Sequence, residues 1–124
     1  MIKCGTDIIE IARIQDALEK EGFKERVYTK QEIEYCESKN VQKYQSYSGR
    51  FAGKEAIFKA LSSIIKDKYK IKWTDLEIIT EKDGRPYVKI NTDVIDKTLI
   101  KNIDISISHC KDYAIAVCII EINN

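Results

Sequence analysis

Two acidic residues stand in surroundings that are unusual for a carboxylate. Asp7 lies in the apolar run from Gly5 to Ile9, and Glu55 lies among small and aromatic residues. A carboxylate in an apolar run is costly unless it is hydrogen-bonded or binds a cation. For Asp7 a helix N-cap is the competing interpretation, because the first helical pattern begins directly after it. Taken alone, the residues favour the cap.

Glu55 is followed one helical turn later by Lys59, so the two side chains project from one side of a helix. Small residues nearby, such as Gly53, would let a ligand or another backbone approach closely. The alternative is an ordinary surface pair worth only about 0.2–0.5 kcal/mol. The charge pattern does not decide between them, although Phe51 and Phe58 place Glu55 at the margin of the core.

The single histidine, His109, ends the segment Ser106-Ile107-Ser108-His109. Polar residues at strand ends are held by a rigid sheet, which favours catalytic or ligand-binding positions. A lone histidine is nevertheless more often structural than functional. No Ser/His/Asp or Cys/His pattern surrounds it, so nucleophilic catalysis is not indicated.

Apolar periodicity predicts the elements that must position these residues. Thr29 and Glu32 form a capping box that starts a short helix. We expect a helix over 11–18 that Gly22 ends, a longer helix over 44–65 and a weak, short helix over 93–101. We expect strands over 2–7, 76–80, 87–90, 103–107 and 114–122. The last two strands would pair across the turn at 110–112, with 114–122 central in the sheet. The order predicts a single α+β domain over residues 1–124, with helices packed on a mainly antiparallel sheet.

The composition is that of a folded domain in a reducing compartment. The chain has 124 residues, 44% of them hydrophobic, and four cysteines but one histidine. No Cys-x-x-Cys motif is present, so a zinc site is not indicated. No apolar run reaches the roughly 18 residues of a membrane span, and no signal-peptide pattern is seen. We therefore expect a cytoplasmic protein with reduced thiols, of which Cys4 and Cys118 would lie in the core.

The net charge of +1 hides a strong segregation of charge. Nine basic and two acidic residues lie between Lys39 and Lys72, so this stretch carries +7 and the remainder carries −6. Such a stretch could bind phosphates or an acidic protein, or could be a solvated lysine-rich helix face. A small nucleic-acid-binding module is one alternative, and it would need neither Asp7 nor Glu55.

Read together, three ordered motifs resemble one family. They are Gly5-x-Asp7-Ile8 with Arg13-Ile14, then Arg50-Phe51-Ala52-x-Lys54-Glu55-Ala56 with Lys59-Ala60-Leu61, then Ser106-Ile107-Ser108-His109 with Ala114-x-Ala116. The chain resembles the holo-[acyl-carrier-protein] synthases, the short bacterial type of 4'-phosphopantetheinyl transferase. The resemblance covers almost the full length and implies the fold of that family.

The resemblance implies a Mg2+-dependent reaction that moves 4'-phosphopantetheine from coenzyme A to a serine of acyl carrier protein. It releases adenosine 3',5'-bisphosphate and serves fatty acid biosynthesis. Asp7 and Glu55 would be the metal ligands, which overturns the cap interpretation of Asp7. Lys59 would reach the pyrophosphate. The general base would be Glu55 or a magnesium-bound water. A hydrolase of a pyrophosphate substrate that uses the same carboxylates on water is a second alternative.

The resemblance also assigns the binding surfaces. Arg50, Ser108 and His109 would contact coenzyme A, with His109 near the 3'-phosphate, and Arg13 would contact the acidic carrier protein. Relatives of this type are homotrimers whose sites lie between subunits, so Arg50 or His109 could serve a neighbouring subunit's site. One departure is Ser62-Ser63, which stands where the family has a glycine-rich stretch. No nucleic acid and no membrane would be involved.

Overall fold

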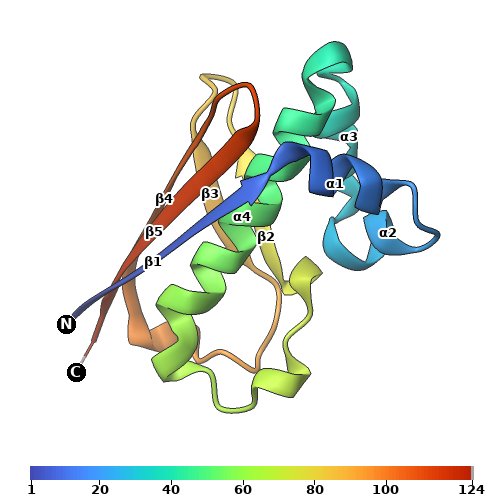
Figure 1. The fold of residues 1–124 in the computed structure, drawn as a ribbon. Coiled ribbons are helices and arrows are strands. Elements are labelled where there is room, and N and C mark those ends of the chain that lie inside the picture. The colour runs from blue at the N-terminus through green and yellow to red at the C-terminus, as the bar shows by residue number, and fades with distance from the viewer. Residues whose placement is uncertain (124) are drawn as a thin grey trace.

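The structure is a computed structural model that describes residues 1–123, and its main sheet has three long strands (Figure 1). They are β1 (Ile2–Glu10), β4 (Ile100–His109) and β5 (Tyr113–Ile122). The sheet is antiparallel in the order β1-β5-β4, so β5 is central, as predicted. In one row across the sheet, Asp7 pairs with Ala116 and Ala116 pairs with Ile107. The first and third motifs therefore lie on the two edge strands of one sheet.

The long helix α4 (Lys43–Leu61) lies across the inner face of this sheet. Close contact with β1 depends on Gly5, because a Cβ atom there would overlap the carbonyl oxygen of Ala56 and lie 2.7 Å from the amide nitrogen of Ala60. The strand thus rests almost directly on the helix backbone. This contact brings the first motif against the second.

A second, smaller sheet packs on another side of α4. It is the hairpin of β2 (Leu76–Thr80) and β3 (Pro86–Ile90), joined by the turn that the sequence predicts. The main core fills the space between the sheets and the helix, and its fully buried members include Ala52, Ala56, Ile57, Leu61, Leu76, Ile78, Cys118 and Ile120. Because α4 is covered on two sides, even Lys54 is fully buried.

Three short helices close one end of the molecule (Figure 1). They are α1 (Ile11–Leu18), α2 (Phe23–Val27) and α3 (Lys30–Glu37). A second core of Ile14, Val27, Tyr28, Cys36 and Tyr47 joins them to α4. The predicted capping box at the start of α3 is confirmed, with both of its hydrogen bonds present. Single 3-10 turns complete the chain at Asn40–Gln42, Ser62–Ile64, Lys68–Lys70, Trp73–Asp75 and Lys97–Leu99.

The α+β prediction is confirmed. Asp7 lies inside β1, which excludes the cap interpretation that the resemblance had overturned, and the N-cap of α1 is Glu10, whose side chain makes no capping bond. Three local predictions are wrong. The long helix ends at Leu61, where Ser62 donates a hydrogen bond to the Lys59 carbonyl. Residues 93–101 form no α-helix, because Ile95 bridges to Ile65 and only one 3-10 turn follows. Cys118 is buried as expected, whereas Cys4 is exposed.

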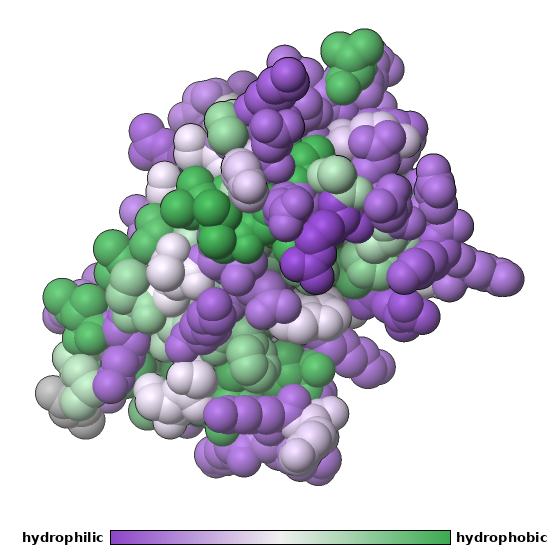
Figure 2. All heavy atoms as spheres, viewed as in Figure 1, coloured by the Kyte–Doolittle hydropathy of each residue, from purple (hydrophilic) through white to green (hydrophobic). Residues whose placement is uncertain are grey.

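The outer face of the main sheet is apolar and uncovered. Ile2, Ile8, Ile115 and Ile119 are between 46% and 69% exposed, and they alternate with inward-facing residues of β1 and β5. Figure 2 shows apolar side chains gathered along the side of the molecule that β1 borders. No helix within residues 1–123 has the length and apolar character needed to cross a membrane.

Candidate functional site

Residues from four elements line one cavity beside β1. Asp7 comes from β1, Arg13 from α1 and Glu55 from α4, with Phe23 and Phe51 forming part of the apolar wall. The close packing of β1 on α4 at Gly5 explains why Asp7 and Glu55 meet although 48 positions separate them. We call this the carboxylate cavity.

The two carboxylates of this cavity influence each other. Burial raises the pKa of the Glu55 carboxyl, the negative charge of Asp7 raises it further, and the charge of Lys59 lowers it. Lys59 Nζ lies 3.4 Å from Asp7 Oδ1 and donates a hydrogen bond of 2.9 Å to the carbonyl oxygen of Thr6. Lys59 therefore pairs across to β1, and no ion pair to Glu55 forms within residues 1–123.

The carboxylate cavity fits a magnesium ion that shares its coordination with a substrate. No group of three or more His, Cys, Asp or Glu side chains within residues 1–123 could enclose a metal. Mg2+ usually binds through one or two carboxylates, several waters and substrate phosphates rather than through a full protein cage. Burial and the charge of Asp7 both raise the pKa of Glu55, and a divalent cation bound between the two carboxylates would offset their negative charge.

A second pocket lies on the hairpin side of α4, with Arg50 at its base. Arg50 is only 5% exposed, its Nη2 donates a hydrogen bond of 2.6 Å to Thr80 Oγ1, and its guanidinium stacks 4.1 Å from the ring centre of Tyr35. Its Nε has no hydrogen-bond partner, and no carboxylate of residues 1–123 pairs with it. A buried guanidinium without a counter-charge is suited to bind an anion.

His109 and Lys39 line the same pocket as Arg50, together with Gly84 and Pro86 of the hairpin turn. We call it the arginine pocket. Ser108 is exposed and does not line it, because neighbouring residues of a strand point to opposite faces. The structure therefore brings Arg50 and His109 together but separates Ser108 from them.

The two pockets lie on different sides of α4. Arg50 and Glu55 are five positions apart, and at about 100° per residue this places their side chains roughly 140° apart around the helix axis. Glu55 and Lys59 are one turn apart and face β1, whereas Arg50 faces β2 and α3. Within one chain, the carboxylates and Arg50 therefore belong to separate half-sites.

Two residues of the arginine pocket were not identified from the sequence. Tyr35 stacks on Arg50, and Lys39 adds a second cation to the pocket. Lys39 belongs to the basic stretch noted above, so charge clustering was the available signal. No sequence pattern indicates that Tyr35 stacks on Arg50, because this contact depends on α3 lying against α4. Arg50 and Lys54 of that stretch are buried, so the nine basic residues do not form one solvated surface.

Comparisons with known proteins agree over nearly the whole chain. Residues 3–118 match the family model of the 4'-phosphopantetheinyl transferase superfamily. The holo-[acyl-carrier-protein] synthase of Ruminiclostridium cellulolyticum is 42% identical, over 97% of this chain and 92% of the relative. That of Clostridium tetani is 44% identical, over 94% of this chain and 93% of the relative.

A solved structure supports the same assignment. The crystal structure of Helicobacter pylori holo-[acyl-carrier-protein] synthase in complex with coenzyme A has a TM-score of 0.81 and 32% identity to this chain. The match covers 98% of this chain and 100% of that one. The resemblance carried by the three motifs is thus confirmed, and the chain belongs to the 4'-phosphopantetheinyl transferase superfamily and, within it, to the holo-[acyl-carrier-protein] synthases.

Proposed function

We propose that this enzyme transfers the 4'-phosphopantetheine group from coenzyme A to a serine hydroxyl of apo acyl carrier protein, in a Mg2+-dependent reaction. The serine oxygen would form a bond to the phosphorus that carries pantetheine, and adenosine 3',5'-bisphosphate would leave. One observation carries the proposal: in a chain of this family, Asp7, Arg13 and Glu55 converge on a single cavity.

The carboxylate cavity would hold the reacting phosphate. Asp7 and Glu55 would bind the magnesium ion, which would neutralise the pyrophosphate charge when bound. Lys59 is half-exposed, so it can turn from Asp7 towards a pyrophosphate oxygen. Of the two acids that line the cavity, Asp7 pairs with Lys59. The serine proton would pass to Glu55 or to a magnesium-bound water.

The arginine pocket would hold the far, anionic end of coenzyme A. The buried Arg50 guanidinium lacks a counter-charge and lies with His109 and Lys39 around one pocket. A phosphate monoester such as the 3'-phosphate would supply the missing charge. Ser108 faces away in this chain, so a contact of Ser108 with coenzyme A would require a neighbouring subunit.

The separation of the half-sites supports a site shared between subunits. We propose a homotrimer, as the resemblance implies, in which Glu55 of one subunit and Arg50 of the next bind one coenzyme A. The exposed apolar face carrying Ile2, Ile8, Ile115 and Ile119 is the surface that such an assembly would bury. All four cysteines are free, in keeping with a cytoplasmic enzyme that serves fatty acid biosynthesis.

Incubation with coenzyme A, Mg2+ and apo acyl carrier protein, followed by intact-mass spectrometry, tests the proposal. We expect the carrier to gain the mass of one phosphopantetheine, and Glu55→Gln to give no gain under the same conditions. An unmodified carrier that a known transferase can modify would contradict the proposal. Free phosphopantetheine with an unmodified carrier would instead indicate the hydrolase.

A further inference from the structure

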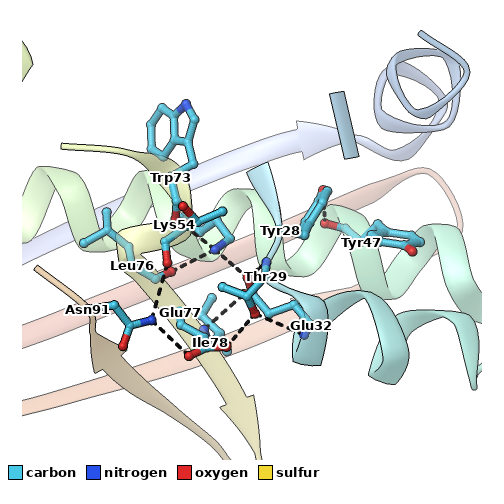
Figure 3. Close-up of polar contacts among 11 residues, drawn as sticks. Tyr28, Thr29, Glu32, Tyr47, Lys54, Trp73, Leu76, Glu77, Ile78 and Asn91 are labelled. Atoms are coloured by element: carbon cyan, nitrogen blue, oxygen red, sulfur yellow. Dashed lines mark hydrogen bonds and ion pairs between the residues drawn. The ribbon is translucent and has the colours of Figure 1, made fainter. Parts of the chain in front are cut away.

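Lys54 is a charged residue in the interior that neither half-site uses. Its side chain is 1% exposed, and its ammonium group lies 2.7 Å from Glu32 Oε1 (Figure 3). The remaining hydrogens point to backbone, because Nζ donates to the carbonyl oxygens of Trp73 at 3.0 Å and Leu76 at 2.9 Å. Every contact of this ammonium group lies on the side of α4 away from β1.

Glu32 ties the same point to two further elements. Its Oε1 accepts a hydrogen bond of 2.9 Å from the Thr29 amide, and its Oε2 accepts one of 3.0 Å from the Ile78 amide. Behind it, Glu77 accepts hydrogen bonds from the Thr29 hydroxyl and from Asn91 (Figure 3). The Lys54–Glu32 pair thus joins α4, α3 and β2 through partners that are themselves fixed.

Such a pair is a poor device for stability alone. A buried ion pair loses the hydration of both charges, and apolar replacements of similar volume are often as stable. Burial lowers the pKa of the Lys54 ammonium, which reflects this desolvation. The pair does fix the orientation of the Lys54 side chain, because its ammonium group can meet its three fixed acceptors in one orientation only.

The fixed orientation of Lys54 affects the carboxylate cavity in two ways. Lys54 is the chain neighbour of Glu55, so fixing its side chain towards β2 fixes the rotation of α4 that points Glu55 at β1. Lys54 also holds the Trp73 carbonyl, and the Trp73 ring packs 6.4 Å from Phe51 and 5.9 Å from Phe58. Trp73 and Phe51 line a pocket that also contains Glu55.

We propose that Lys54 and Glu32 are positioning residues that set the rotation of α4 and thereby hold Glu55 opposite Asp7. The effect of the pair on turnover rests on the proposed function, whereas its effect on the position of Glu55 does not. It assigns a role to an interior pair that touches neither substrate nor metal.

The test compares Lys54→Met, Glu32→Gln and the double variant. Each single change leaves one buried charge unpaired and should lower the urea midpoint strongly, whereas the double variant should recover most of the loss. Water-proton relaxation measures the affinity for Mn2+ in the presence of coenzyme A. This affinity reports on the positions of the two carboxylates without requiring turnover. We expect the folded double variant to bind Mn2+ about tenfold more weakly and to lose about tenfold in kcat.

The matched control is Lys43→Met with Glu37→Gln, an exposed pair that also joins α3 to α4. It should keep wild-type Mn2+ affinity and kcat. A folded double variant with wild-type Mn2+ affinity and kcat overturns the proposal. If the double variant lacks a cooperative unfolding transition, Glu32→Asp is measured instead, because it keeps the charge but has a shorter side chain. Wild-type Mn2+ affinity and kcat in Glu32→Asp would overturn the proposal.

The same experiment separates the two proposals. A wild-type protein that binds Mn2+ but does not modify the carrier contradicts the proposed function, while the Mn2+ affinities still decide the role of the pair. A wild-type protein that does not bind Mn2+ in the presence of coenzyme A contradicts both.

Discussion

At the residue scale, Glu55 combines partial burial with a neighbouring negative charge. Both raise the pKa of its carboxyl, so the folded protein holds the Glu55 proton more tightly than the unfolded chain does. Ionised Glu55 therefore lowers the free energy of unfolding at neutral pH when no metal is bound. Function and stability oppose each other at this position.

Glu55→Gln should accordingly stabilise the metal-free protein at neutral pH while it removes carrier modification. The gain in unfolding free energy should shrink as the pH falls through the raised pKa, because wild-type Glu55 then becomes neutral. Urea unfolding at a series of pH values, without divalent cations, measures this. A gain that grows on acidification would contradict the assigned environment of Glu55.

Arg50 is buried, and no carboxylate within residues 1–123 pairs with its charge. Arg50→Met should keep the stack against Tyr35 in part but remove the cation, so the KM for coenzyme A should rise at least about tenfold. Arg50→Lys should restore little, because an ammonium neither stacks flat nor offers the same fork of donors. Steady-state kinetics with varied coenzyme A measure both effects. An unchanged KM for Arg50→Met would remove Arg50 from the donor site, and an unchanged KM for Arg50→Lys would contradict the need for a guanidinium.

Arg13 lines the carboxylate cavity, and the resemblance assigns it to the contact with the carrier protein. It is exposed on α1, and charge reversal there should repel an acidic partner. Arg13→Glu should lower kcat/KM for the carrier by about 10-fold or more at low salt and leave the KM for coenzyme A nearly unchanged. Equal losses with both substrates would contradict a carrier contact.

At the scale of elements, the contact of β1 with α4 depends on one missing side chain. Gly5→Ala would drive a methyl group into the backbone of α4, which cannot move away locally. We expect a loss of at least about 1–3 kcal/mol in unfolding free energy. Gly53→Ala is the matched control, because its methyl would meet the side-chain ends of Ile78, Ile105 and Ile107 and no backbone atom, and alanine favours the helix by about 1 kcal/mol. Similar losses in the two variants, measured by urea unfolding, would contradict the backbone contact.

Local pattern was sufficient for most of the elements. The capping box at Thr29, the hairpin and the alternation of the last two strands each depend on neighbouring residues, and each is confirmed. The predicted helix over 93–101 failed because Ile95 pairs with Ile65, a long-range bridge without a local signal. The predicted burial of Cys4 was wrong because Cys4 lies on the outer face of the sheet. That face is apolar and exposed, so an apolar run there does not imply burial.

The site shows the same division. The family motifs identified Asp7 and Glu55, and the structure brings them into one cavity. The spacing left open an ion pair between Glu55 and Lys59, and in the structure Lys59 pairs instead with Asp7, because β1 passes over that side of α4. The buried state of Lys54 could not be predicted, since its carboxylate partner lies 22 positions away on α3.

At the scale of the whole molecule, the uncovered face of the main sheet is the largest departure from a self-sufficient monomer. Ile115 lies on the central strand β5, 46% exposed on that face. Ile115→Asp should leave the fold intact, because its side chain lies on the outer face and away from the core between the sheet and α4, but should dissociate the proposed trimer. Sedimentation velocity should show the mass fall from about three chains of 14.3 kDa to one.

Activity provides the second readout of that variant. The monomeric variant should lose carrier modification while keeping Mn2+ binding, since the carboxylate cavity is complete within one chain. A fully active monomer would contradict a site shared between subunits.

Because α4 carries both half-sites and is covered on two sides, it restricts how the gene can change in length. Inserting or deleting one codon between Arg50 and Glu55 would turn the two halves of the helix by about 100° relative to each other. The carboxylates and the arginine would then no longer serve the same donor, however conservative the inserted residue. Length variation among relatives should therefore fall outside the segment from Arg50 to Glu55, in the turns that precede and follow the helix.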